Sequence, residues 1–567
     1  MVAVQSPKIY DAMVIGSGIT GGWAAKELTE KGLEVLVLEA GRNIVPARDY
    51  SEHVPPWEVQ FRGLKDHRKL AEEQPVQRLA GACDEWASKF FVNDLDNPYS
   101  THPEGDEFRW IRGRQVGGRS IMWGRQSYRW SDLDFEANAK DGYGVDWPIR
   151  YRDLAPWYDH VEDFAGICGQ NEGLAQLPDG KFLPPIEMNC VEKEVRGRLD
   201  KAFGGARRFM HARAAVLTKA HKGRRACHYC GPCRRGCMTR SYFSSLNSTL
   251  PAAQATGRMT LRPHSVVREI TVDPRTGKAR GATVIDGRTL ETREFRARMV
   301  FLCTSTVESA RILLNSRSAT FPDGLANSSG QVGRNLMDHF FQVGGSGLIE
   351  GFLDKTTFGR RPNACYMPRY VNLDGEGSDF LRGYGFQGGV NRGTTWRSAT
   401  TRPGFGADFK HSLREQGPWR MRLVAFGECL PNPDNRVEID PDVVDKWGVP
   451  VPRIHMRFGE NEELMRADVK KTVVETLEAA GAKKISTFDR ESKPGFAIHE
   501  MGTVRMGRDK RTSVLNGNNQ AWDVTNLFVT DGSCMASTAW QNPSLTYMAL
   551  TARAADYAAR QLGDGQL

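Results

Sequence analysis

The stretch from Tyr10 to Arg42 constrains the fold of this chain more than any other part, because it has the pattern of one complete strand, turn, helix and second strand. The apolar run Ala12 to Ile15 leads directly into a G-x-G-x-x-G motif formed by Gly16, Gly18 and Gly21. Trp23 to Lys31 has helical composition, and Val35 to Leu38 is a second apolar run. The pattern therefore predicts a β-α-β unit that begins a parallel sheet.

The motif also predicts a ligand. In such a unit the first glycine permits the tight turn, the second lets the backbone approach a pyrophosphate, and the third lets the helix pack close to the strand. The phosphates then meet the free N–H groups at the helix N-terminus. Glu39 lies eighteen residues after Gly21, where an acid would bind a ribose 2′-hydroxyl. A glycine triplet alone also fits a plain turn, but the complete unit favours dinucleotide binding.

The composition is that of a soluble globular protein with room for two or more domains. Of 567 residues, 26% are charged and 40% hydrophobic, and 77 basic against 68 acidic residues give a net charge of +9. A surplus this small is weak support for a polyanionic partner. No apolar run approaches the roughly 18 residues that span a bilayer. The start, MVAVQSPKIYDA, lacks the basic and apolar regions of a signal peptide.

Later segments extend the opening sheet and then change its character. Met299 to Cys303 is an apolar run followed by a predicted helix, Val307 to Asn315, and we expect this strand to lie beside the opening unit. Residues 331–496 hold short alternating runs separated by Gly, Pro and Asn, which is typical of an antiparallel sheet.

The predicted fold class is therefore α/β plus β, with a Rossmann-like dinucleotide-binding domain and an antiparallel-sheet substrate domain. Both domains are predicted to be discontinuous. We assign residues 1–90, 220–330 and 497–567 to the dinucleotide-binding domain. We assign residues 91–219 and 331–496 to the cofactor cover and the substrate-binding domain.

Four of the eleven cysteines are crowded into eleven residues: Cys227, Cys230, Cys233 and Cys237. Their spacing matches that of bacterial ferredoxins up to the proline that usually follows, which is Met238 here. Iron–sulfur ligation is the interpretation we favour. Zinc is an alternative, although tetrahedral zinc sites usually pair two distant C-x-x-C knuckles, and a segment without metal is another. Because only one such run exists, a four-iron and a three-iron cluster both fit.

Positive charge surrounds this cysteine run, and residues 221–240 contain no acid. The basic residues are Lys222, Arg224, Arg225, Arg234, Arg235 and Arg240. Their charge would offset an anionic cluster and attract an acidic redox partner. A nucleic-acid patch is the rival interpretation. A single aromatic residue and the lack of a groove-reading helix pattern argue against it, so no nucleic-acid partner is predicted.

The carboxy-terminal segment combines a histidine with a helix start. Asn542 and Pro543 have the pattern of an N-cap and a first-turn proline before an alanine-rich helix that runs to about Arg560. The N-terminus of that helix would direct partial positive charge at whatever lies before it. His499 fits a general base, because imidazole titrates near neutral pH. Each residue alone also fits a bland role, as an inert buried histidine or as a plain helix cap.

In their order and over most of the chain, these segments resemble the glucose-methanol-choline flavoprotein oxidoreductases. The segments that carry the resemblance are GSGITGG with Glu39, RGRQVGGRSIMWG, STVESARILLNS, QVGRNLMDH, HEMGT, and NLFVTDGS with NPSLT. The resemblance implies that the cofactor is FAD. It also implies non-covalent binding, because Met122 stands where pyranose oxidases of the family carry a flavin-linking histidine.

The same resemblance implies roles for individual residues. Glu39 is expected on the adenosine ribose, and His499 with Asn542 is expected to form the catalytic pair. Further cofactor contacts are expected from Arg42, Gly117, Gly118, Val267, Asp531, Gly532 and Asn542.

The cysteine run departs from the simple oxidases of the family. In this respect the chain is similar to the membrane-linked sugar and polyol dehydrogenases, a group that includes the catalytic subunits of glucoside 3-dehydrogenases. That resemblance implies a sugar or glycoside substrate, a small accessory subunit with an export signal, and a c-type cytochrome. It also implies a periplasmic location reached by carriage with the partner, whereas the missing signal peptide by itself favours the cytoplasm.

The resulting hypothesis is an FAD-dependent dehydrogenase that oxidises a secondary hydroxyl, at C3, of a sugar or glycoside to the ketone. A flavin accepts two electrons together and a cytochrome accepts one, so a cluster between them is the physical reason that oxygen need not be the acceptor. The first rival is an oxygen-using sugar oxidase whose metal site is structural. The second is a non-catalytic electron-transfer subunit that has kept FAD.

Overall fold

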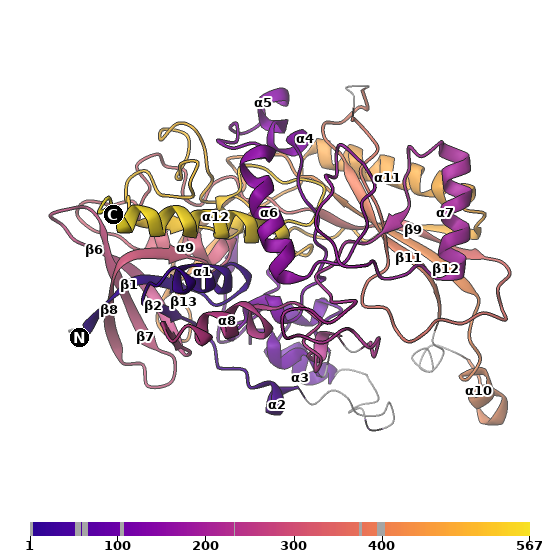
Figure 1. The fold of residues 1–567 in the computed structure, drawn as a ribbon, viewed down its shortest axis with the longest axis horizontal. Helices are drawn as coiled ribbons and strands as arrows, with labels where there is room; N and C mark the ends of the chain where they lie inside the picture. The colour runs from indigo at the N-terminus through magenta and orange to yellow at the C-terminus, as the bar shows by residue number, and fades with distance from the viewer. Residues whose placement is uncertain are drawn as a thin grey trace.

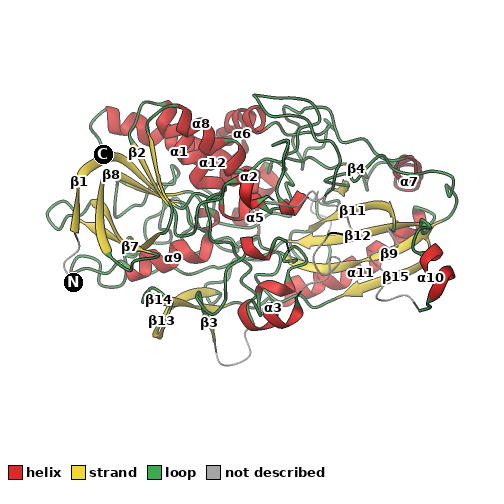
Figure 2. Cartoon of the chain, turned by 90° about the horizontal axis from the view of Figure 1, so that it is seen from below, coloured by secondary structure: helices red, strands yellow, loops and turns green. Residues whose placement is uncertain are grey.

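The computed structural model describes residues 4–50, 58, 66–84, 86–102, 107–231, 233–373, 377–393 and 403–567. In this part of the chain, two large sheets lie toward opposite ends of an elongated molecule, and helices pack around both (Figure 1). A smaller sheet lies at the lower edge of the view in Figure 2 and consists of β13 (Arg436–Val444), β14 (Pro450–His455) and β3 (Ser100–Thr101).

The first sheet is built on the predicted β-α-β unit. β1 (Val4–Ile15) lies between β2 (Val35–Leu38) and β8 (Thr292–Leu302), and both pairs are parallel. β5 (Met259–Arg262) continues the parallel order beyond β2. Every residue of β2 is buried, as expected for a strand covered on both faces. The predicted place of the Met299–Cys303 run, beside the opening unit, is confirmed.

β8 changes partner along its length. Its first half pairs antiparallel with β7 (Ala279–Asp286), which forms a hairpin with β6 (Ser265–Val272). Its last residues, Val300 to Leu302, pair in parallel with β16 (Leu527–Val529). The end of the chain therefore returns to the carboxyl edge of the parallel strands, which is where ligands bind in open α/β sheets.

Helices cover both faces of this sheet (Figure 2). One layer contains α1 (Ile19–Glu30), α6 (Tyr151–Ala165), α8 (Thr249–Ala255) and α12 (Ser544–Gly563). On the other side, α9 (Thr306–Asn315) confirms the predicted helix at this position. The small side chains of α1 and α12 share one buried cluster, which lets the two helices approach closely: Ala24, Ala25, Ala554, Ala555 and Ala558.

The second sheet is antiparallel throughout, as predicted. Its strands in spatial order are β15 (Lys483–Asp489), β9 (Phe340–Ile349), β12 (Trp419–Gly427), β11 (Tyr384–Arg392), β10 (Cys365–Met367) and β4 (Met210–His211). Helix α11 (Glu460–Ala479) packs on one face, where it meets the buried residues Met421 and Leu423 of β12. The alternate residues of β12 point the other way, into a cavity described below.

The fold class predicted from the sequence is confirmed: a Rossmann-like sheet with helices on both faces, joined to an antiparallel sheet. The boundaries assigned to the two domains stay a prediction. No helix in the described ranges is both long enough and apolar enough to cross a bilayer. None of the eleven cysteines, all within the described ranges, forms a disulfide.

Candidate active site

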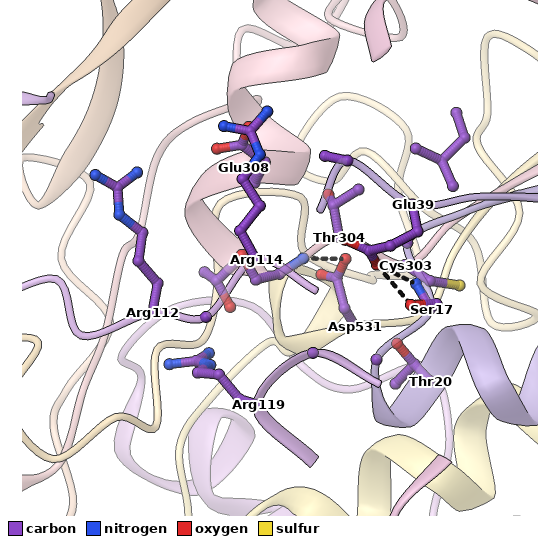
Figure 3. A pocket seen from close by; sticks show the side chains of 18 of the residues that line it. Ser17, Thr20, Glu39, Arg112, Arg114, Arg119, Cys303, Thr304, Glu308 and Asp531 are labelled. Atoms are coloured by element: carbon purple, nitrogen blue, oxygen red, sulfur yellow. Dashed lines mark hydrogen bonds between the residues drawn. The ribbon is translucent and has the colours of Figure 1, made fainter. Parts of the chain in front are cut away.

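The first cavity of the candidate site lies against the glycine motif, at the carboxyl edge of the parallel strands (Figure 3). Most of the predicted cofactor residues line it: Gly16, Gly18, Glu39, Gly118, Val267, Asp531 and Gly532. Gly21, Gly117 and Arg42 are not part of this lining. The Arg42 guanidinium instead pairs with Asp49, with 2.8 Å between Nη1 and Oδ1.

The three glycines of the motif have three different backbone environments. A Cβ atom on Gly21 would lie 1.9 Å from the Gly16 carbonyl oxygen, so this position needs close packing between helix and strand. Gly16 has a φ of +96°, which favours glycine. A Cβ on Gly18 would meet no atom within 4 Å. Gly18 therefore borders open space, as the backbone that receives a pyrophosphate must.

Glu39 lines this cavity, but its carboxylate is already occupied. Its Oε2 accepts hydrogen bonds from the backbone N–H of Ser17 (3.2 Å) and from the Ser17 hydroxyl (2.5 Å), and its Oε1 accepts from the N–H of Gly41 (2.8 Å). Figure 3 shows Glu39 reaching toward Ser17. Burial raises the pKa of Glu39, against these hydrogen bonds. Glu39, which the sequence assigns to a ribose, thus also stabilises the glycine turn through its hydrogen bonds with Ser17.

Three arginines that sequence reasoning did not assign extend along one side of the cavity in Figure 3: Arg112, Arg114 and Arg119. Arg112 and Arg114 both donate hydrogen bonds to Asn97. Their guanidinium groups lie over Trp110 and Trp447, at 3.8 and 4.0 Å from the ring centres. Such positive charge suits a pyrophosphate. The signal was present in the alternation of arginine, glycine and aromatic residues from Arg109 to Arg129.

A second cavity, of about 660 Å³, contains both residues of the predicted catalytic pair, His499 and Asn542. One wall is the free face of the second sheet, with Arg422, Val424 and Phe426 of β12. The two cavities meet, because they have five lining residues in common: Ile19, Arg119, Ser120, Ile498 and Tyr547. A group that extends from the first cavity through this junction would end beside the histidine.

His499 is paired with a second histidine, His339. Their Nδ1 atoms lie 2.8 Å apart, and Nε2 of His339 forms a short hydrogen bond with the Ala539 carbonyl. A carbonyl only accepts, so the neutral His339 carries its hydrogen on Nε2 and accepts at Nδ1 from His499. Burial lowers the pKa of His339 to about 4 and, with the charge of Arg119, holds the pKa of His499 well below its usual value. Nε2 of a neutral His499 therefore keeps its lone pair.

Asn542 is not the N-cap of α12, which is a correction to the sequence prediction. The helix begins at Ser544, Pro543 is the cap residue, and no side chain caps the end. The Asn542 side chain instead lies 3.1 Å from His499 Nε2 through its Nδ2, and its Oδ1 accepts from Gln387 (2.7 Å). Gln387 lies in β11, far away in sequence, so the local sequence around Asn542 could not predict this hydrogen bond.

The amide of Asn542 is oriented by a chain of hydrogen bonds. The Tyr128 hydroxyl donates to Oε1 of Gln126 (2.6 Å), and Nε2 of Gln126 donates to Oε1 of Gln387 (3.2 Å). Gln387 then donates to Oδ1 of Asn542. Every amide in the chain has one orientation that satisfies both neighbours. The Asn542 NH₂ group is thereby directed at His499.

Asp338 holds the segment that carries His499. Its Oδ1 accepts from the backbone N–H of His499 (3.0 Å), and its Oδ2 accepts from those of Gly495 (2.8 Å) and Ala497 (3.2 Å). Burial and the nearby Glu500 raise the pKa of Asp338 to about 8, while the three N–H groups favour the charged form. Sequence reasoning gave no role to Asp338 or His339, although both stand in the QVGRNLMDH segment.

The residue after His499 fixes the junction of the two cavities. Both carboxylate oxygens of Glu500 pair with the Arg119 guanidinium, at 3.1 and 2.8 Å. Only 2% of the Glu500 side chain is exposed, so breaking the pair would leave a buried charge without a partner. The pair thus ties the glycine-rich segment that contains Gly118 to the segment that contains His499.

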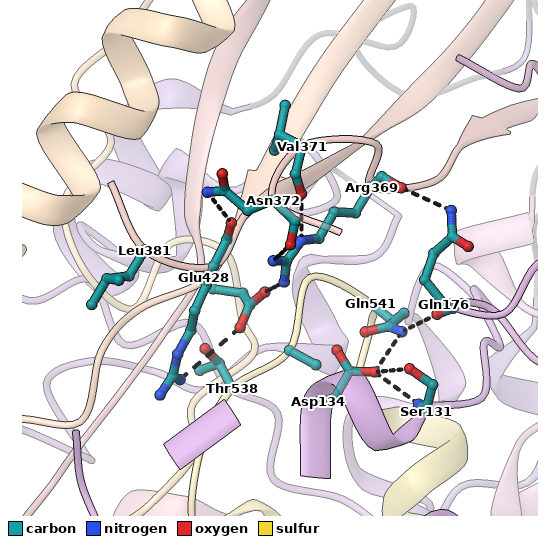
Figure 4. Close-up of polar contacts among 12 residues, drawn as sticks. Ser131, Asp134, Gln176, Arg369, Val371, Asn372, Leu381, Glu428, Thr538 and Gln541 are labelled. Atoms are coloured by element: carbon teal, nitrogen blue, oxygen red, sulfur yellow. Dashed lines mark hydrogen bonds and ion pairs between the residues drawn. The ribbon is translucent and has the colours of Figure 1, made fainter. Parts of the chain in front are cut away.

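A buried polar network anchors the loop before Asn542 (Figure 4). Nε2 of Gln541 donates to Oδ2 of Asp134 (3.0 Å), and the Thr538 hydroxyl bonds to the backbone of Cys429. Burial raises the pKa of Asp134 to about 6 and that of Glu428, also in this network, to about 7. The loop is therefore held on both sides by groups from distant parts of the chain.

The four predicted metal ligands line one small cavity, which Tyr242 and Pro362 help to enclose. Within the described ranges, no three histidine, cysteine or acidic side chains are placed so that they could hold a metal ion. The thiols surround a space and do not meet at a point. Polar groups approach their sulfur atoms: the Tyr229 N–H donates to Cys227 (3.4 Å), and the Thr239 and Ser241 hydroxyls each lie 3.5 Å from Cys237.

Arg224 is buried beside this cysteine cavity. Its Nη2 donates to the carbonyls of Ala165 (2.5 Å) and Phe164 (3.2 Å), and its Nη1 has no hydrogen-bond partner. Burial lowers the pKa of Arg224 to about 10, and the group that opposes this shift is the thiol of Cys237. No described carboxylate compensates this guanidinium, so its environment suits a negatively charged occupant of the cysteine cavity.

The cysteine cavity and the second cavity share a wall. Tyr242 lines the cysteine cavity, and Trp123 lines the second cavity. The Tyr242 hydroxyl donates a hydrogen bond to the Trp123 carbonyl (2.8 Å). Trp123 in turn donates from Nε1 to the Phe243 carbonyl (2.9 Å). Arg234, which follows Cys233, lines the second cavity directly. Tyr242 and Trp123 therefore lie between the cysteine cavity and the cavity that contains His499.

The chain matches two family models, each described as GMC oxidoreductase, over residues 10–341 and 431–551. It is 30% identical to 2-methyl-1,2-propanediol dehydrogenase of Mycolicibacterium austroafricanum, over 98% of this chain and 96% of that protein. It is 26% identical to the fructose dehydrogenase large subunit of Gluconobacter japonicus, over 98% of each. Among solved structures, a variant of formate oxidase from Aspergillus oryzae has the same fold, with a TM-score of 0.64, 14% identity and full coverage of both chains.

Proposed function

Because the chain belongs to the GMC oxidoreductase family, whose members bind FAD and act on CH–OH groups, we propose that it is an FAD-dependent dehydrogenase that oxidises a secondary alcohol of a sugar or glycoside, at C3, to the ketone. The observation that carries this proposal is the His499–Asn542 pair, 3.1 Å apart, in a cavity that adjoins the first cavity and its glycine motif.

The proton of the substrate hydroxyl goes to Nε2 of His499 in this proposal. The neutral ring, with its hydrogen on Nδ1, presents a lone pair to the cavity. A hydroxyl that enters between His499 and Asn542 donates to the imidazole and accepts from the Asn542 amide, which replaces the direct contact between the two side chains. The amide then stabilises the negative charge that develops on the oxygen as the proton leaves.

The residues of the first cavity fit FAD. The open space at Gly18, the N-terminus of α1 and the three arginines suit its pyrophosphate. FAD supplies the hydride acceptor when bound. Asn542, Pro543 and Ser544, at the N-terminus of α12, line the second cavity. The helix N-terminus directs partial positive charge at that cavity, which would favour the negative charge of a reduced acceptor there.

The four cysteines are proposed to hold an iron–sulfur cluster, of the four-iron or three-iron type. Tetrahedral zinc sites usually pair two distant C-x-x-C knuckles, whereas these four thiols come from eleven consecutive residues and line one cavity. The N–H and O–H groups near Cys227 and Cys237, with the buried Arg224, suit a negatively charged group. When bound, the cluster supplies one-electron transfer.

The electron acceptor is proposed to be a c-type cytochrome, carried with a small accessory subunit that bears an export signal. The name of the fructose dehydrogenase large subunit says that this relative works in a multi-subunit enzyme. On the surface beside the cysteine cavity, Met238 is 57% exposed and Arg240 is exposed, which suits an acidic partner. In this arrangement the enzyme is periplasmic by carriage with its partner.

The test uses the purified protein with a panel of sugars and glycosides under anaerobic conditions, with an artificial one-electron acceptor. We expect turnover, a flavin absorption spectrum, bound iron, and ketone formation at C3 in the product. His499→Ala should lower kcat/KM by about 10²- to 10⁴-fold while FAD stays bound. Fast peroxide formation in air without an added acceptor would contradict the dehydrogenase, and a protein without iron would contradict the cluster.

A further inference from the structure

The second cavity carries more positive charge than oxidation of a neutral sugar requires. Four arginines line it: Arg119, Arg125, Arg234 and Arg422. Among the described residues of its lining there is no aspartate or glutamate. Arg119 pairs with Glu500 outside the lining, but the other three form no ion pair with any carboxylate in the described part of the chain.

Arg125 adds a buried positive charge to this set, because only 6% of the residue is exposed. Its Nη2 donates to the Pro362 carbonyl (2.7 Å), and its guanidinium lies 4.6 Å from the ring centre of Tyr242. Its Nε and Nη1 are buried and have no hydrogen-bond partner. A buried guanidinium with two unsatisfied nitrogens and no counter-charge is destabilising unless a bound group compensates it.

Arg422 and Arg234 reach the same cavity from other parts of the fold. Arg422 stands on β12, beside the cavity residues Val424 and Phe426, and its guanidinium lies 4.1 Å from the ring centre of Phe488. Arg234 comes from the cysteine segment. Neither lines the first cavity or its junction with the second, so both are placed away from the expected path of the dinucleotide.

We propose that the second cavity selects a sugar derivative that carries a carboxylate or a phosphate, with the anion held by Arg422 and Arg234 while a ring hydroxyl meets His499. The buried charge of Arg125 adds to the positive potential of the cavity. A guanidinium forms paired hydrogen bonds with either anion. Arg422 and Arg234 are exposed, so their guanidinium groups are accessible to such a ligand. This inference rests on the proposed sugar dehydrogenase and narrows its substrate class.

The first experiment compares three substrates that differ only around C6: a methyl glucoside, the corresponding methyl glucuronide and the corresponding methyl glucoside 6-phosphate. We expect kcat/KM to be roughly 10- to 100-fold higher for an anionic member than for the glucoside at low salt, with a smaller ratio at high salt. The glucuronide and the phosphate arms show which anion is preferred. A glucoside that is turned over as well as both anions would overturn the proposal and leave the dehydrogenase function intact.

Two arginine variants on β12 test whether the preference for anionic substrates depends on the cavity. Arg422→Gln should raise KM for the anionic substrate about tenfold or more and leave the glucoside unchanged. Arg420→Gln is the matched control, because Arg420 lies two residues earlier on the same face of β12 and is not part of the cavity. Anion recognition by Arg422 would be contradicted if Arg422→Gln raised KM equally for the anionic substrate and the glucoside. It would also be contradicted if Arg420→Gln raised KM for the anionic substrate as much as Arg422→Gln does.

A binding measurement separates this proposal from the proposed activity. Inorganic sulfate, added to the FAD-loaded protein without substrate, should perturb the flavin absorption spectrum and should bind less tightly to Arg234→Gln and Arg422→Gln. It should also compete with the anionic substrate. If no sugar is oxidised but sulfate still binds in this way, the proposed function fails and the anion site stands. If sulfate neither binds nor competes, the anion site fails.

Discussion

The Nδ1 atoms of His339 and His499 lie 2.8 Å apart, and Asp338, the residue before His339, accepts the backbone N–H of His499. Two adjacent residues thus act on the same histidine in different ways. Asp338 fixes where its backbone lies, and His339 fixes which ring nitrogen carries the hydrogen. In the proposed mechanism both effects are needed, since the base must face the cavity through an unprotonated Nε2.

His339→Leu removes the acceptor for the His499 Nδ1 hydrogen, so the ring is free to adopt the tautomer with its hydrogen on Nε2. We expect kcat to fall by on the order of 10²-fold or more. His339→Gln offers a carbonyl oxygen in place of the imidazole nitrogen and should restore part of the rate. The measurement is anaerobic turnover with an artificial acceptor.

If His339 had only a structural role, His339→Leu would lower the folding stability and leave the pH profile of kcat/KM unchanged. In the leucine variant, the acid limb of the kcat/KM profile should also shift, because the pKa of His499 loses the influence of its neighbour. If the glutamine and leucine variants have equal rates and the wild-type pH profile, His339 does not set the tautomer.

The depressed pKa of His339 also predicts a pH dependence of folding stability. Burial lowers the pKa to about 4 from the ordinary 6.5, so between these values the unfolded chain binds a proton that the folded chain does not. Stability from this group is fully present above pH 6.5 and is lost as the pH falls toward 4, by about 3 kcal/mol in total. Chemical unfolding of wild type and His339→Leu across this range should give curves that converge toward low pH. Parallel curves would show that His339 keeps its ordinary pKa when folded.

Asn542→Ser distinguishes the partner of His499 from a helix cap. Serine caps helices about as well as asparagine, so a residue that served only as a cap would tolerate the change in both stability and rate. The structure instead has the amide 3.1 Å from His499 Nε2, which a serine side chain is too short to replace. We expect kcat/KM to fall on the order of 10²-fold, with little change in melting temperature. Unchanged kinetics would remove Asn542 from the proposed mechanism.

Two alanine substitutions in the glycine motif should separate cofactor binding from folding. In Gly21→Ala the new Cβ would lie 1.9 Å from the backbone oxygen of Gly16, so the strand and helix must move apart and the fold should lose several kcal/mol. In Gly18→Ala the Cβ meets no atom of the protein, so the FAD-free chain should keep its melting temperature. Titration with FAD should then show at least about tenfold weaker binding by Gly18→Ala. Equal FAD affinity in wild type and Gly18→Ala would place the pyrophosphate elsewhere.

Local signals identified the elements whose pattern is complete within a short stretch. The β-α-β unit from Tyr10 to Arg42 could be predicted because apolar runs, glycines and a helical segment follow each other within one supersecondary unit. The cysteine spacing likewise brought four thiols to one cavity. The prediction failed at Asn542, where a local cap pattern lost to a hydrogen bond from Gln387, 155 residues earlier in the chain.

The sequence by itself determined the parallel sheet, the glycine turn, the antiparallel second sheet and the identity of His499 and the four cysteines as candidates. Only the tertiary structure decided that His339 and Asp338 control His499, that Arg125, Arg234 and Arg422 converge on one cavity, and that this cavity adjoins the cysteine cavity through Trp123 and Tyr242. The reason is physical. Secondary structure follows from the spacing of side chains along a few turns or strands, whereas the hydrogen on a ring nitrogen and the charge of a cavity depend on groups that folding brings together from distant parts of the chain.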